Sequence, residues 1–137
     1  MEKADIVGVW RLVSWEMIDG EGHKTSIYGD NPLGCLIYTA DGYMSAHLSQ
    51  ANPVSFQNAS YFAAKPEEAF NYYQHFFSYA GRYELDRDFA VHHIEVCSFP
   101  NWIGSSQKRQ LKVQEDRLYI MHEIDNNKRA ELVWKRC

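Results

Sequence analysis

Two ionisable side chains, His93 and Glu95, stand two residues apart in a segment rich in β-branched and aromatic residues. This segment, residues 89–99, is predicted to be a strand, and alternate side chains of a strand point to the same face. A buried imidazole beside a carboxylate titrates near neutral pH and can move protons. The spacing therefore predicts either an acid–base pair or a pair that orients a ligand.

Other polar and aromatic side chains could share a cavity with this pair, because they fall at alternate positions of other predicted strands. Both faces of several strands are apolar, so the pattern leaves open which face is inside. The predicted ligand-contacting set is Tyr38, Tyr43, His47, Tyr83, His93, Glu95, Trp102, Arg109 and His122.

A structural role competes with catalysis for the same residues, and we favour it. Glu95 could pair with Arg109 while His93 bonds a tyrosine hydroxyl, because buried charges need such partners. Trp102 lies in a predicted loop at one end of the fold. It could contact a ligand at the rim or seal that end as an apolar plug.

A metal site is the third interpretation. His47, His93, His122 and Glu95 have the ligand chemistry that zinc or non-haem iron prefers. However, the chain has no close spacing such as His-Glu-x-x-His, and no motif for haem attachment. We therefore expect no metal and no cofactor.

The elements that would position these residues are short strands separated by turn signals. Asp41-Gly42 between two β-rich runs is the strongest hairpin signal in the chain. A succession of hairpins favours an up-and-down barrel, and about eight strands enclose room for one small ligand. The predicted strands are 7–17, 23–28, 35–40, 43–48, 79–85, 89–99, 107–113, 117–124 and 129–136.

One α-helix is expected near residues 66–78. Pro66 suits the first helical position, and the acidic residues that follow it favour a helix N-terminus. Phe70, Tyr73, Phe76 and Phe77 recur at helical spacing and are expected either to cap the barrel or to pack against it.

Composition excludes several classes of partner. The 137 residues suit one domain, 1–137, with a net charge of −4 and no basic stripe, so nucleic acid is not expected. The chain has no apolar run long enough for a membrane span and no signal-peptide pattern. Three widely spaced cysteines indicate free thiols rather than a disulfide framework. We therefore expect a cytoplasmic protein.

The segment Gly8-Val9-Trp10 resembles the Gly-x-Trp motif on the first strand of lipocalins. In that family a basic residue near the chain end accompanies the motif, and Arg136 matches its position. The resemblance implies that the guanidinium of Arg136 lies across the Trp10 indole and closes one end of the barrel.

Further segments are similar to the compact bacterial and fungal lipocalin-like domain family. They are residues 36–46, 79–84, and 91–104 with Gln107 and Arg109. The resemblance implies an all-β, up-and-down antiparallel barrel of about eight to ten strands. It implies little about chemistry, because most members of the family have no assigned function.

Three functions remain open at this point. The first is binding of a small, largely apolar or aromatic molecule inside the barrel. The second is a cofactor-free isomerase, cyclase or hydrolase that uses His93 and Glu95. The third is a structural or interaction protein with a filled barrel. A homodimer is compatible with each of them.

Overall fold

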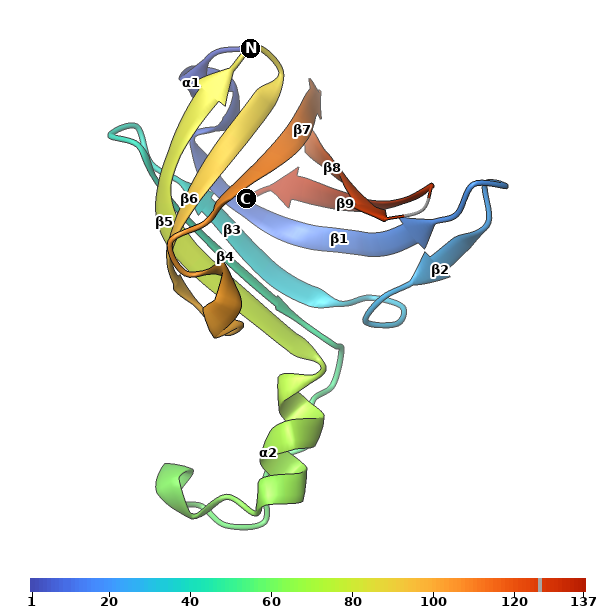
Figure 1. The fold of residues 1–137 in the computed structure, drawn as a ribbon, viewed down its shortest axis with the longest axis vertical. Coiled ribbons are helices and arrows are strands. Elements are labelled where there is room, and N and C mark those ends of the chain that lie inside the picture. The colour runs from blue at the N-terminus through green and yellow to red at the C-terminus, as the bar shows by residue number, and fades with distance from the viewer. Residues whose placement is uncertain (126) are drawn as a thin grey trace.

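The protein forms one antiparallel sheet that curls into a barrel (Figure 1). The computed structural model describes residues 1–125 and 127–137. The strands are β1 (Gly8–Ile18), β2 (Lys24–Ser26), β3 (Leu33–Tyr38), β4 (Tyr43–Ser49), β5 (Phe76–Asp86), β6 (Phe89–Cys97), β7 (Ser106–Gln114), β8 (Arg117–Asp125) and β9 (Lys128–Arg136). The helices are α1 (Lys3–Ile6), η1 (Tyr61–Ala63), α2 (Pro66–Tyr73) and η2 (Pro100–Trp102).

The strand order confirms the predicted up-and-down barrel. Strands β3 to β9 pair in sequence order, β1 pairs with β3, and a further β1–β9 pairing closes the ring of eight strands. Strand β2 pairs with the far end of β1 and lies outside the ring. The predicted turn over residues 125–128 includes Asn126, which lies outside the described residues.

One end of the barrel is closed by the N-terminal segment. Here α1 inserts Ile6 fully into the core. The Arg136 guanidinium lies 4.2 Å from the Trp10 ring centroid and donates to the carbonyls of Val7 and Asp5. Gly8 has φ +137°, and a Cβ there would lie 3.0 Å from Arg136, so the glycine of the motif lets the arginine reach the indole.

A β-bulge in β6 changes which residues of that strand face inward. Ala80 of β5 pairs with Val96, but Gly81 pairs with Ile94, so Glu95 is an extra residue. The bulge depends on Gly81, because a Cβ there would run into the carbonyl oxygen of His93. Residues before the bulge and residues after it therefore follow opposite alternation.

The helix prediction was correct at its start and wrong at its end. α2 begins at Pro66, but it ends at Tyr73 rather than near residue 78. Phe76 and Phe77 instead pair with Ser49 and Leu48 in the β4–β5 ladder. Ladder pairing and burial of the Phe77 side chain outweigh the helical periodicity that continues through these residues.

The helix also does not cap the barrel. Residues 50–75 form an arm that extends away from the strands (Figure 1). Phe70 is 64% exposed and Tyr73 is 41% exposed, so these two side chains do not form the predicted apolar cap. No helix in the described part of the chain has the length and apolar character to cross a membrane.

Candidate functional site

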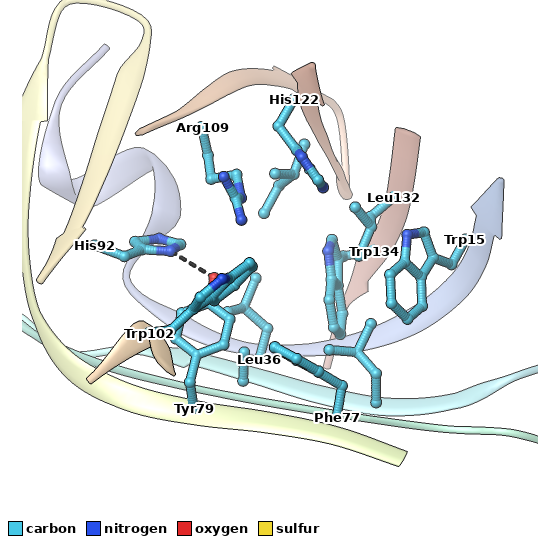
Figure 2. A pocket seen from close by; sticks show the side chains of 13 residues that line it. Trp15, Leu36, Phe77, Tyr79, His92, Trp102, Arg109, His122, Leu132 and Trp134 are labelled. Atoms are coloured by element: carbon cyan, nitrogen blue, oxygen red, sulfur yellow. Dashed lines mark hydrogen bonds between the residues drawn. The ribbon is translucent and has the colours of Figure 1, made fainter. Parts of the chain in front are cut away.

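The barrel encloses a cavity of about 120 Å³. Each of the eight ring strands contributes to its wall, together with η2 (Figure 2). The lining side chains are those of Trp15, Leu36, Ala46, Leu48, Phe77, Tyr79, His92, Trp102, Arg109, Ile120, His122, Leu132 and Trp134. The cavity therefore lies where inward-facing positions of the strands meet.

Most of the cavity wall is aromatic or aliphatic. The Trp102 ring packs edge-on against Phe77 and Tyr79, with centroids 5.2 Å and 6.1 Å away. Trp15 and Trp134 lie on the other side of the cavity in Figure 2. Such a wall favours flat apolar molecules, because aromatic pairs contact well edge-to-face or offset-stacked.

A buried hydrogen-bonded chain lies at the polar end of the cavity. His92 is 1% exposed, and its ring bonds Tyr38 Oη through Nε2 at 2.7 Å and Tyr79 Oη through Nδ1 at 2.8 Å. Burial, helped by the nearby charge of Arg109, lowers the pKa of His92 to about 3. The imidazole is therefore neutral at physiological pH. Burial also raises the pKa of both tyrosines, so their hydroxyls stay protonated.

Arg109 brings a positive charge into the same end of the cavity. The residue is 8% exposed, and its guanidinium lies 5.7 Å from the Trp102 ring centroid. It donates to its neighbour's carbonyl, that of Lys108, at 3.2 Å. In the described part of the chain no carboxylate lies within 4.0 Å of it.

His122 lies beside Arg109 in the wall (Figure 2). Its Nδ1 lies 3.3 Å from the Glu123 carbonyl oxygen, so this nitrogen carries a proton and donates it. Burial, with a contribution from the charge of Arg109, lowers the pKa of His122 to about 4. The two cavity histidines therefore add no positive charge near neutral pH.

The predicted ligand-contacting residues divide into three groups. Trp102, Arg109 and His122 line the cavity. Tyr38 and Tyr83 are buried outside the lining, with ring centroids 4.8 Å apart, and Tyr83 donates to the Thr39 carbonyl. The remaining four lie on the outside of the barrel.

Those four are Tyr43, His47, His93 and Glu95, and the expectation that they face a cavity with the others was wrong. His93 lies between Glu84 and Ser106 on the outer face, with ring nitrogens 3.1 Å and 2.8 Å from their oxygens. Glu95 is the exposed bulge residue, which contacts neither His93 nor Arg109 in the hydrogen bonds of the described chain. Tyr43 accepts from Arg82, and His47 bonds Ser45.

The sequence reasoning missed His92 because it selected the wrong face of β6. Ala90, His92 and Ile94 are the buried set, at 0%, 1% and 2% exposure. A signal was present in the small Ala90, since an inward position in a narrow barrel favours small side chains. Gly81 on the neighbouring strand was a signal for the bulge.

The predicted metal ligands are not brought together. In residues 1–125 and 127–137, no three His, Cys, Asp or Glu side chains group closely enough to hold a metal ion. His47 and His93 lie outside the barrel, whereas His122 lines the cavity.

The fold and the closed end define a lipocalin-like barrel. The chain belongs to the lipocalin-like domain family, whose model matches residues 7–137. It is 25% identical over 107 residues to the 4'-hydroxy-3'-methoxypropiophenone carrier protein of Aspergillus oryzae, an alignment that covers 68% of this chain and 96% of the carrier.

The solved structures that match this chain are more distant in sequence. An uncharacterized protein from Bacteroides eggerthii matches with a TM-score of 0.49 at 12% identity, over 96% of this chain and 98% of that one. The fluorescent protein UnaG matches with a TM-score of 0.46 at 14% identity, over 99% of this chain and 100% of that one.

Proposed function

We propose that this protein binds a small, single-ring aromatic molecule, or a similarly flat apolar one, inside the barrel. The observation that supports this most is the cavity of about 120 Å³ with its aromatic wall. An apolar protein cavity of about 150 Å³ holds one benzene molecule. One ring therefore fits with little adjustment.

The expected affinity for a bare ring is modest. Burying an aromatic ring removes roughly 150–200 Å² of apolar surface from water, worth about 4–5 kcal/mol at about 25 cal/mol per Å². This corresponds to a dissociation constant near 1 mM or somewhat below. Tighter binding requires the polar groups of the cavity as well.

The similarity to a carrier protein supports a binding role. The name of the Aspergillus oryzae relative gives its cargo as an aryl ketone with one aromatic ring. A ligand of that size agrees with the cavity of this chain.

The other two functions have less support. Acid–base catalysis by His93 and Glu95 would have to take place on the outer face, away from the aromatic cavity. A solid barrel does not agree with the cavity that remains between the side chains.

The test is an NMR titration with acetophenone that follows the indole N–H signals of Trp15, Trp102 and Trp134. We expect saturable shifts in the wild type. Ala46→Leu adds three carbons to the cavity wall and is expected to weaken binding about tenfold, because the ligand and the new side chain compete for the same space. Ala40→Leu makes the same change in the exposed β3–β4 turn and is the matched control.

Equal affinity in both variants would place the ligand elsewhere, and the absence of saturable shifts would refute the proposal. Native mass spectrometry of the purified protein gives an independent measurement, because a retained small molecule would add its mass to the chain.

A further inference from the structure

The cavity contains a buried positive charge that the described protein does not neutralise. Arg109 is more than nine-tenths buried and points into the cavity (Figure 2). Its contacts include the face of Trp102, the Lys108 carbonyl and the Tyr79 hydroxyl, none of which carries a negative charge. A buried charge is costly unless it is paired, so a negative charge from outside the chain would stabilise this site.

The Tyr79 hydroxyl is a second hydrogen-bond donor at the Arg109 end of the cavity. Neutral His92 has one N–H, so one ring nitrogen donates and the other accepts. The Tyr38 hydroxyl is fully buried, and His92 Nε2 is its hydrogen-bond partner within the described chain, so the Tyr38 proton has a partner only when Tyr38 donates to Nε2. Nδ1 then donates to Tyr79 Oη. The Tyr79 proton is left free to donate to a ligand in the cavity.

The remaining polar groups of the wall fit the same ligand. The Nε1 atoms of Trp15 and Trp134 are buried donors without a hydrogen-bond partner in the described structure. His122, whose Nδ1–H faces the Glu123 carbonyl, offers a neutral acceptor but no negative charge. The wall is therefore rich in donors and has no anion to balance Arg109.

We propose that the ligand has an anionic oxygen that pairs with Arg109 and accepts a hydrogen bond from the Tyr79 hydroxyl. This oxygen belongs to a carboxylate or a phenolate. This inference rests on the proposed binding function and specifies the ligand class. The aromatic wall holds the ring, and the anion lies at the His92 end of the cavity. A charge-assisted hydrogen bond in a site with little water selects an anion over its neutral isostere.

The test compares isosteric pairs of ligands by NMR titration at pH 7.5. Benzoate and benzamide differ in charge and have nearly the same shape. We expect wild type to bind benzoate about tenfold to a hundredfold more tightly, the range for hydrogen bonds to charged groups. Arg109→Met keeps the length of the side chain and is expected to abolish this preference. Arg82→Met removes an arginine from the outer face, where it contacts Tyr43, and is expected to keep it.

4-Nitrophenol tests for a phenolate ligand, whereas benzoate and benzamide test for a carboxylate. A site that prefers phenolate ionises bound 4-nitrophenol at a lower pH, and the absorbance of the yellow anion measures this shift without any variant. We expect a downward shift of at least about one pH unit, equivalent to a tenfold preference. Tyr79→Phe keeps the ring, removes the hydroxyl, and is expected to reduce the shift. This arm remains informative if Arg109→Met does not fold.

The outcomes separate the two proposals. If acetophenone and benzamide bind as tightly as benzoate, and the 4-nitrophenol pKa is unchanged, the anion site is refuted while aromatic binding stands. A preference that persists in Arg109→Met also refutes it. If no aromatic probe binds, both proposals fail.

Discussion

Acidification is expected to destabilise this protein through His92. The imidazole is held neutral between two tyrosines, and its pKa falls from 6.5 to about 3 on folding. Between these two values the unfolded chain binds a proton that the folded chain does not. The free energy of unfolding therefore decreases as the pH falls below 6.5.

The size of this loss of stability follows from how far the pH lies below the pKa of the unfolded histidine. At pH 5 the unfolded histidine lies about 1.5 units below its pKa, which corresponds to about 2 kcal/mol at about 1.36 kcal/mol per unit. His92 is almost fully buried, so solvent screening reduces this little. His122, with a pKa of about 4, acts in the same direction but less, since it is more exposed. For a chain of this size, 2 kcal/mol lowers Tm by about 7 °C.

The assay is urea unfolding of wild type and His92→Gln at pH 7.5 and pH 5. Glutamine can still donate and accept between the two tyrosines, but it does not titrate. We expect the variant to lose about 2 kcal/mol less than wild type over this interval. Ile94→Val is the control, because it weakens the same buried strand by about 1 kcal/mol and leaves His92 in place.

Two results would refute this reasoning. The first is a His92→Gln variant whose free energy of unfolding falls with pH as much as that of the wild type. The second is an Ile94→Val variant that loses the pH dependence, which would show that loss of strand stability rather than titration accounts for the effect.

Two further predictions concern the barrel itself. Gly81→Ala is expected to cost at least about 3 kcal/mol in urea unfolding, because the new Cβ meets the His93 carbonyl at the bulge; a loss below 1 kcal/mol would mean that the bulge adjusts. Arg136→Met is expected to cost about 1–3 kcal/mol through the lost contact with Trp10 and two backbone carbonyls, and unchanged stability would show that the closed end does not depend on the guanidinium.

The architecture could be predicted from sequence because its signals are local. Asp41-Gly42 set a hairpin between β3 and β4, and Pro66 set the start of α2. Alternating apolar residues and short turns favour antiparallel pairing between strands that are neighbours in the sequence. The order of the strands in the sheet could therefore be predicted from their order along the chain. The residues of the closed end, Gly8, Trp10 and Arg136, were found through resemblance to a family rather than through spacing.

The end of α2 could not be predicted in this way. Helical periodicity continues through Phe76 and Phe77, and strand β4, which pairs with them, lies more than 25 residues earlier in the chain. The competition between a longer helix and a longer β5 is decided by that distant ladder. The same pairing turns Phe77 into the cavity, while the arm extends away from the strands.

The sequence by itself determined a ring of antiparallel strands with an aromatic interior, because strand alternation and turn chemistry act between near neighbours. Tertiary structure decided that His92 rather than His93 faces the cavity, because the bulge beside Gly81 makes Cys97 rather than Val96 the inward residue beyond it, and alternation counted back from Cys97 selects the wrong histidine. It also decided that Arg109 lies buried without a carboxylate in the described chain, because Glu95 points to solvent. A side chain's face depends on register with its neighbours, and register is a property of the assembled barrel.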